Sequence, residues 1–186
     1  FFTLEAMSLP LSCSSGGTSK EFNFIKFALN VAYFPKIFAG PVVGPEGLRL
    51  NSASITGVKS GLILVLLGLF KKGVIGDTLG LKVSEIFDSP YTSQTLADPG
   101  LMFFQGLALF VLQLYVDFSG YTDIARGISR TMGIELPINF DRPFMTTSFA
   151  TAWTRWHISV VRWFRVQVYD RLLGDSRSQN RAAIAV

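Results

Sequence analysis

The chain has 186 residues, of which 49% are hydrophobic and 16% are charged, and its formal net charge is +4. Soluble domains carry roughly 25% charged residues, so this composition, with 17 Phe and a mean hydropathy of +0.38, favours membrane segments joined by polar connections. One Cys and one His exclude a disulfide framework and a cysteine-based zinc site, and cations that flank apolar runs and tryptophans argue against a nucleic-acid partner.

The N-terminal quarter predicts a helix between two irregular segments. Residues 9–17 are rich in Ser and Gly and predict a loop, whereas residues 22–34 predict a helix. Residues 33–45 contain three Pro and two Gly, so they cannot continue that helix, yet they stay apolar. Broken backbone at membrane depth persists only where it is buried in protein or lines a cavity. Two interpretations therefore stay open, a re-entrant or interfacial segment and an ordinary apolar loop.

Two long apolar runs follow. Residues 55–70 form the clearest predicted membrane helix, closed by Lys71 and Lys72 and extended by further apolar residues toward the ~20 residues that a span needs. The alternative is a buried helix of a soluble protein. Residues 76–100 are mixed and predict a connection outside the bilayer, and residues 101–116 predict a second apolar helix.

The second apolar run leads into a polar stretch. Helical spacing places three side chains on one stripe, namely Gln113, Asp117 and Tyr121. Others fall on the opposite side, namely Tyr115, Ser119, Thr122 and Arg126, with Asp123 beside them. This segment must face protein or water, or break near Ser119, and carboxylates in a membrane helix indicate a functional site by default. The alternative is that Asp117 and Asp123 lie at the interface and pair with Arg126 or Arg130.

The last predicted helix carries the only histidine. Residues 132–144 predict a loop, after which Thr146, Thr147 and Ser148 offer N-caps for a helix through Val168. Its apolar face would carry Trp153, Trp156, Val160, Trp163 and Phe164, with Arg155 and Arg162 opposite. That pattern is typical of a helix lying in the membrane interface. His157 is the one side chain whose ordinary pKa suits a general base near neutral pH, and the alternative is a packed, hydrogen-bonded histidine.

Several motifs occur in an order that resembles the membrane-bound O-acyltransferase family. They are residues 1–8, 33–35, 39–41, 68–72, 113–127, 136–140, 153–159 and 163–165. The Asp-Phe-Ser-Gly-Tyr run at residues 117–121 favours the bacterial alginate O-acetylation branch over the D-alanyl branch. Residues 9–17, Val166 and residues 169–174 depart from the family pattern.

The resemblance implies an all-α, multi-pass transmembrane fold with re-entrant or interfacial helices, in a bacterial cytoplasmic (inner) membrane. We expect residues 1–186 to be the central part of one domain, truncated at both ends. The implied activity is transfer of an acetyl or other acyl group to hydroxyls of an exported polysaccharide such as alginate. Alternatives are D-alanyl transfer to teichoic acid by the same fold, a non-enzymatic transporter subunit, and a non-catalytic scaffold.

The resemblance also implies roles for residues and partners. His157 matches the first histidine of the family, a supporting residue, while the principal catalytic histidine, in a Trp-His-Gly context, lies downstream of this chain. The implied substrate-tunnel residues are Gln113, Tyr115, Asp117, Ser119, Tyr121, Asp123, Asn139, Arg155 and Trp156. No cofactor is expected to be bound. The implied co-substrate is acetyl-CoA or an acyl-carrier thioester on the cytoplasmic side, and the acceptor is a periplasmic or extracellular polysaccharide or an acyl-relay partner protein.

Overall fold

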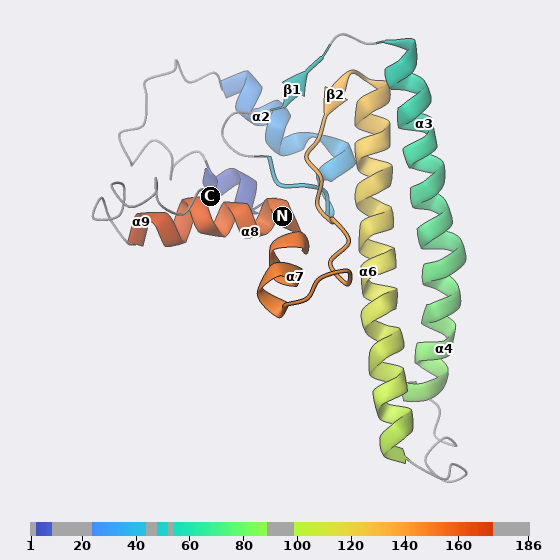
Figure 1. The fold of residues 1–186 in the computed structure, drawn as a ribbon. Coiled ribbons are helices and arrows are strands. Elements are labelled where there is room, and N and C mark those ends of the chain that lie inside the picture. The colour runs from blue at the N-terminus through green and yellow to red at the C-terminus, as the bar shows by residue number, and fades with distance from the viewer. Residues whose placement is uncertain (1–2, 9–23, 44–47, 52–53, 89–98, 173–186) are drawn as a thin grey trace. The chain divides into compact units, whose positions relative to one another are not determined.

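The computed structural model describes residues 3–8, 24–43, 48–51, 54–88 and 99–172, most of which are helical (Figure 1). The chain divides into two compact units. One contains Phe1–Leu48 and Pro137–Val186, and the other contains Arg49–Leu136. The prediction of a loop at residues 9–17 falls outside the described residues.

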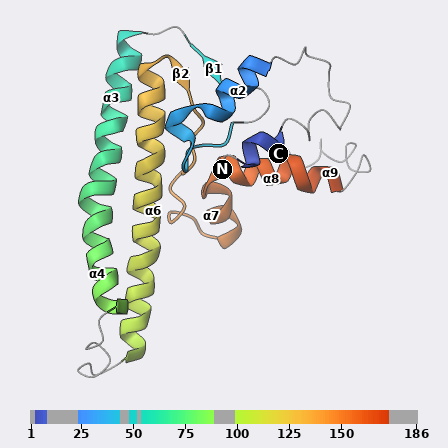
Figure 2. The same ribbon diagram turned by 180° about the vertical axis from the view of Figure 1, so that it is seen from behind.

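The unit formed by residues 49–136 is a long helical hairpin. Its first arm begins with α3 (Ile55–Leu69), continues through a π-helical turn, η2 (Phe70–Gly76), and ends with α4 (Asp77–Asp88). The second arm is α6 (Pro99–Thr131), which runs antiparallel to the first and packs along it (Figures 1 and 2). Ser54 caps the N-terminus of α3, where its Oγ accepts a hydrogen bond from Gly57 N at 3.0 Å.

Two glycine pairs set the spacing of this hairpin. A Cβ added at Gly61 would lie 2.7 Å from the carbonyl oxygen of Gly127, and one at Gly68 would lie 2.5 Å from that of Gly120. The converse additions would meet the partner carbonyl at 2.6 and 2.9 Å. Since glycine lets two helix backbones approach this closely, these four residues determine how α3 and α6 pack.

A short antiparallel sheet closes the end of the hairpin. Strand β1 (Arg49–Leu50) pairs with β2 (Ile134–Glu135), so that Arg49 lies opposite Glu135. The Asn51 N–H donates to the Gly133 carbonyl at 2.7 Å, and Arg130 at the end of α6 forms an ion pair with Glu135. These contacts tie the chain before α3 to the chain after α6.

The other unit has a core that contains many polar side chains. It consists of a helical segment at residues 3–8, α2 (Phe24–Ala32), the 3₁₀ turn η1 (Phe34–Lys36), α7 (Phe149–Arg155), α8 (Ile158–Phe164), the π-helical turn η3 (Arg165–Tyr169) and α9 (Asp170–Leu172). Its buried polar side chains among the described residues are Glu5, Ser8, Asn30, Lys36, Asn139, His157, Ser159 and Gln167. A core of this kind is held by directional bonds as well as by apolar packing.

Several predicted elements are confirmed. Residues 24–32 form α2, and residues 33–43 of the predicted irregular segment do break the helix, with Pro41 and Val42 buried in protein. Residues 55–69 form α3, and the second apolar run forms α6, which continues without a break past Ser119 and Gly120. It does so because Ser119 is buried and Gly120 packs against the backbone of α3.

Two predicted elements are wrong. Residues 76–100 are not simply a connection, because Asp77–Asp88 continues the first arm as α4, with no proline to stop it. The helix predicted through Val168 is also not continuous. It begins at the predicted cap, Ser148, whose Oγ accepts from Thr151 N at 3.2 Å, but it breaks at Trp156 and His157.

Among the described residues, one helix is long and apolar enough to cross a membrane by length and composition, namely Gly100–Thr131. Little of the apolar part of that helix is buried, and most of its residues are exposed or partly exposed.

Candidate functional site

His157 lies at a sharp turn between α7 and α8. Trp156 is extended, and His157 has φ 45° and ψ 53°, which is the left-handed region. A residue with a Cβ loses about 1–2 kcal/mol in that region and keeps such a conformation only where its surroundings enforce it. The turn changes the direction of the chain between the two helices (Figure 1).

Asn139 supplies the bonds that enforce this turn. Its carbonyl oxygen accepts from Ile158 N at 2.9 Å, and its side-chain Oδ1 accepts from Ser159 N at 3.2 Å. The next amide, Val160 N, donates to the carbonyl of His157 at 3.0 Å. The first turn of α8 therefore has partners for amides that no carbonyl of the helix can bind, although the His157 side chain provides no cap.

The two segments run side by side around this point. Asp141 N donates to the Arg155 carbonyl at 3.1 Å, so residues 139–141 accompany residues 155–159 on both sides of the turn. The Phe140 ring packs edge-on against Trp156, with centroids 5.1 Å apart, and lies 5.9 Å from the His157 ring. Residues 139–141, part of the loop predicted at 132–144, thus form one wall of the histidine site, whereas Ile134–Glu135 of that predicted loop form β2.

The His157 side chain is buried, with 6% of the residue exposed. Burial disfavours the imidazolium ion and lowers the pKa of His157 to about 4. The imidazole is therefore neutral at physiological pH and offers one nitrogen as a donor and the other as an acceptor. A neutral imidazole with this pKa is better suited to hydrogen bonding with a reacting carbonyl or hydroxyl than to accepting a proton from it.

The Gly-Pro segment joins this site through Ser159. Val42 N donates to Ser159 Oγ at 2.9 Å, and the next amide, Val43 N, donates to Glu5 Oε1 at 3.0 Å. Glu5 forms an ion pair with Lys36, and Lys36 Nζ also donates to Asn30 Oδ1 at 3.1 Å. A buried network of charge and amide bonds thus holds the broken segment beside the first turn of α8.

Sequence reasoning missed Glu5, Lys36, Asn30 and Ser159 as members of this site. A signal was present, because Lys36 is the single charged residue within the apolar segment at 33–45. A lysine buried in such a segment requires an anionic partner. Its partner, Glu5, lies 31 positions away, and nothing local in the sequence identifies it.

The predicted apolar face of the last helix is corrected by the break at His157. Trp163 does not face outward with Trp153, because it is 7% exposed and its Nε1 donates to Ser8 Oγ at 2.6 Å. Trp153, by contrast, is 56% exposed. The turn at His157 redirects α8, so residues on either side of it no longer share one helical face.

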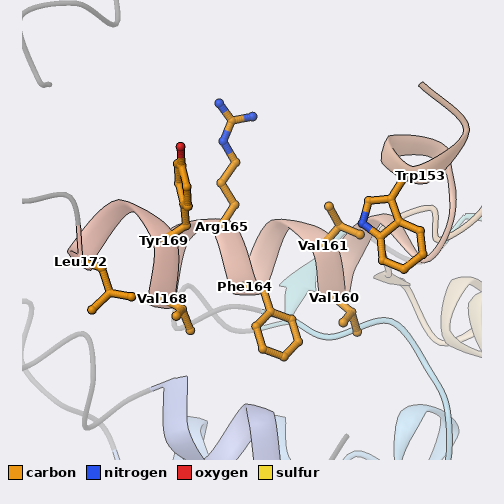
Figure 3. Close-up of a pocket in the computed structure, with 8 residues that line it drawn as sticks. All are labelled: Trp153, Val160, Val161, Phe164, Arg165, Val168, Tyr169 and Leu172. Atoms are coloured by element: carbon orange, nitrogen blue, oxygen red, sulfur yellow. The ribbon is translucent and has the colours of Figure 1, made fainter. Parts of the chain in front are cut away.

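An apolar groove of about 490 Å³ lies along α8, η3 and α9. It is lined by Trp153, Val160, Val161, Phe164, Arg165, Val168, Tyr169 and Leu172. Figure 3 shows Val160, Phe164 and Val168 pointing to one side of the helix and Arg165 and Tyr169 to the other. Its lining is apolar apart from the Arg165 guanidinium and the Tyr169 hydroxyl.

The predicted carboxylates of α6 lie in the hairpin unit and are paired. Lys71 Nζ donates to Asp123 Oδ2 at 2.6 Å, and Lys72 pairs with Asp117. The π-helical turn η2 presents both lysines to α6, and such turns are frequent at functional sites. The alternative partners proposed from sequence are right only in part, because Arg126 Nη1 lies 3.6 Å from Asp123 whereas Arg130 pairs with Glu135.

The ten predicted site residues divide between the two units. Four of them lie together at the turn between α7 and α8, namely Asn139, Arg155, Trp156 and His157. The others follow one another along α6, namely Gln113, Tyr115, Asp117, Ser119, Tyr121 and Asp123. Within α6, Ser119 is buried, and Gln113 lies beside Gly80, where an added Cβ would meet its Nε2 at 2.8 Å.

Comparison with known proteins gives consistent matches. The sequence model of the membrane-bound O-acyltransferase family matches residues 13–186. The probable alginate O-acetylase AlgI of Pseudomonas aeruginosa is 35% identical over 182 residues, which cover 96% of this chain and 34% of that protein. The peptidoglycan O-acetyltransferase of Helicobacter pylori is 34% identical over 160 residues, covering 82% of this chain and 29% of that protein.

A third relative is named for the transfer of a different acyl group, D-alanyl. The teichoic acid D-alanyltransferase of Streptococcus thermophilus is 29% identical over 180 residues, covering 93% of this chain and 43% of that protein. The chain spans about a third of the length of the alginate O-acetylases that it matches.

Proposed function

Because the chain belongs to the membrane-bound O-acyltransferase family, we propose that the whole protein transfers an acetyl or other acyl group to hydroxyls of an exported polysaccharide such as alginate. The observation that carries this proposal is the buried, neutral His157, held at an enforced turn in a chain of this family. The relatives named for acetyl transfer are also more similar in sequence than the D-alanyl relative.

The proposed reaction is an acyl transfer. A hydroxyl oxygen attacks the carbonyl carbon of a thioester donor, a base takes the hydroxyl proton, and the carbon–sulfur bond breaks to release a thiolate, which is then protonated. We assign the base to the second histidine of the family, outside these 186 residues. Neutral His157 supports the reaction by hydrogen bonding, for example to the oxyanion that forms on the carbonyl.

The donor and acceptor belong to opposite sides of the membrane in this proposal. The donor is acetyl-CoA or an acyl-carrier thioester on the cytoplasmic side, and the acceptor is a polysaccharide or an acyl-relay partner protein outside. The family resemblance implies substrate-tunnel residues in both parts of the chain, on the polar side of α6 and at the turn around His157. The residues assigned to the tunnel are Gln113, Tyr115, Asp117, Ser119, Tyr121, Asp123, Asn139, Arg155 and Trp156.

We also propose that the chain crosses a bacterial inner membrane more than once. α3 and η2 contain 15 and 7 residues in an unbroken run, which at 1.5 Å per residue is roughly 30 Å, the thickness of a bilayer core. Leu62, Leu66 and Phe70 on this run are exposed. The ion pairs of Lys71 and Lys72 with α6 neutralise charges that would otherwise be costly inside a membrane.

The proposal is tested with membranes that contain the full-length protein. Membranes are supplied with acetyl-CoA labelled in the acetyl group and with the exported polymer of the same cells. We expect label in the polymer that mild alkali releases, since an O-acetyl ester is alkali-labile, and no such label with membranes that lack the protein. A parallel reaction receives labelled D-alanine in place of labelled acetyl-CoA. Incorporation of that label instead would identify the D-alanyl activity, and incorporation of neither label would overturn the acyltransferase proposal.

A further inference from the structure

Asn139 is the most buried polar side chain at the turn, with 1% of the residue exposed. It binds two consecutive amides, Ile158 N through its carbonyl and Ser159 N through Oδ1. These amides follow the left-handed His157 directly, so Asn139 fixes the backbone on the C-terminal side of the histidine. Asp141 fixes the other side through its bond to Arg155.

Only one half of the Asn139 amide takes part in this arrangement. Ser159 N is a donor, which assigns the bonded atom as the side-chain oxygen. The Nδ2 group is buried and has no hydrogen-bond partner among the described residues. A side chain that kept the oxygen and lost the nitrogen would therefore preserve every bond that Asn139 makes to α8.

From this geometry we infer that Asn139 is a positioning residue, which acts on the proposed acyl transfer by holding His157 in its left-handed turn. Only the expected effect of Asn139 on the rate of acyl transfer rests on the proposed function; its effect on the His157 backbone does not. A bond from residue 139 to the start of α8 replaces the cap that His157 does not make. Loss of this bond releases the His157 backbone toward ordinary helical angles, which turns the imidazole away from the reacting groups.

Two variants of the full-length protein separate this role from a general loss of structure. Asn139→Ala removes the Oδ1 acceptor. Asn139→Asp keeps an oxygen at that position, and a carboxylate is favoured at a helix N-terminus. Asn51→Ala, at an exposed asparagine of the hairpin unit, is the matched control for the substitution itself.

The first measurement is hydrogen exchange of a peptide that covers residues 157–161, in detergent and without substrate. We expect exchange at least tenfold faster in Asn139→Ala than in wild type, wild-type protection in Asn51→Ala, and protection restored in Asn139→Asp. Unchanged protection in Asn139→Ala overturns the inference, whatever the activity of the protein. So does an equal loss of protection in the Ala and Asp variants.

The second measurement is a double-mutant cycle on acyl transfer. We expect Asn139→Ala to lower kcat at least tenfold with little change in KM, Asn139→Asp to recover most of it, and Asn139→Ala to have less than a twofold effect when His157 is already Ala. The same fold-loss in both backgrounds would show that Asn139 acts independently of His157 and would overturn the inference. Absence of acyl transfer in the wild type would instead count against the proposed function, and the exchange measurement would still decide the role of Asn139.

Discussion

At the scale of single residues, the unusual feature of this chain is a histidine whose backbone is strained and whose ring is neutral. His157 has a left-handed φ and a pKa lowered to about 4 by burial. Strain and desolvation at one residue commonly coincide with function, because both persist only when the surrounding structure enforces them. Here Asn139, Phe140 and Ser159 form that surrounding structure.

The lowered pKa of His157 predicts a pH-dependent stability. Between about pH 6.5 and pH 4 the unfolded chain binds a proton at residue 157 that the folded chain does not bind, so the free energy of unfolding falls as the pH falls through this range. His157→Gln removes this contribution. The thermal midpoint of the full-length protein in detergent should therefore fall more steeply toward pH 4 in the wild type than in His157→Gln. Parallel pH profiles for the two proteins would show that His157 is not desolvated in the folded state.

The buried ion pair of Glu5 and Lys36 predicts that a single substitution of Glu5 strongly lowers the free energy of unfolding. Glu5→Gln leaves the Lys36 charge buried without its carboxylate, and we expect a loss of about 3–5 kcal/mol in the free energy of unfolding. Glu135→Gln is the matched control at a partly exposed pair, where about 1 kcal/mol or less is expected. Adding Lys36→Met to Glu5→Gln should recover part of the loss. Similar small losses at Glu5 and Glu135, measured by denaturant unfolding, would contradict a buried pair.

At the scale of elements, the hairpin depends on glycine contacts that allow α3 and α6 to touch along their backbones. Gly68→Ala places a methyl group 2.5 Å from a carbonyl oxygen, and Gly120→Ala places one at 2.9 Å. We expect each to destabilise the hairpin by about 1–3 kcal/mol, seen as a lower unfolding midpoint. Gly73→Ala is the control, because an added Cβ there meets nothing within 4 Å. Equal midpoints for Gly68→Ala and Gly73→Ala would show that α3 and α6 are not in contact at this point.

The sequence predicts the helices of this protein better than their interruptions. The apolar runs at residues 55–70 and 101–116 identify α3 and the start of α6, because a long continuous apolar run predicts a helix from neighbouring residues alone. The break at His157 depends on Asn139, which lies 20 positions from the amide that its side chain binds. Residues 149–168 contain no Pro or Gly that would stop a helix, so the break could not be predicted from them.

The sequence likewise predicts part of the candidate site, namely the residues within its motifs, but not the contacts between distant parts of the chain. The resemblance identified Asn139, Arg155, Trp156 and His157, which do lie together. It did not identify the network of Glu5, Lys36 and Asn30, because pairing of distant charges requires the fold. The partners of Asp117 and Asp123 were also misjudged in part, since η2 brings Lys71 and Lys72 to them and a π-helical turn has no clear signature in sequence.

At the scale of the whole molecule, the proposed membrane arrangement makes a prediction about sidedness. If α3 with η2 spans the bilayer, residues before α3 and at the end of α4 lie on opposite sides. Single cysteines at Asn51 and Asp88, placed in a full-length protein whose native cysteines are replaced, should react with a membrane-impermeant thiol reagent from opposite sides. Labelling of both from the same side would contradict a membrane-spanning first arm.

The central claim is that this family member transfers acyl groups with the help of His157. The most direct measurement compares acetyl label carried to the polymer by membranes that contain wild-type protein, His157→Ala or the control Asn51→Ala at equal inserted amounts. We predict at least a tenfold loss of incorporation with His157→Ala and wild-type incorporation with Asn51→Ala. Wild-type incorporation by correctly inserted His157→Ala would contradict any role of this histidine in the reaction.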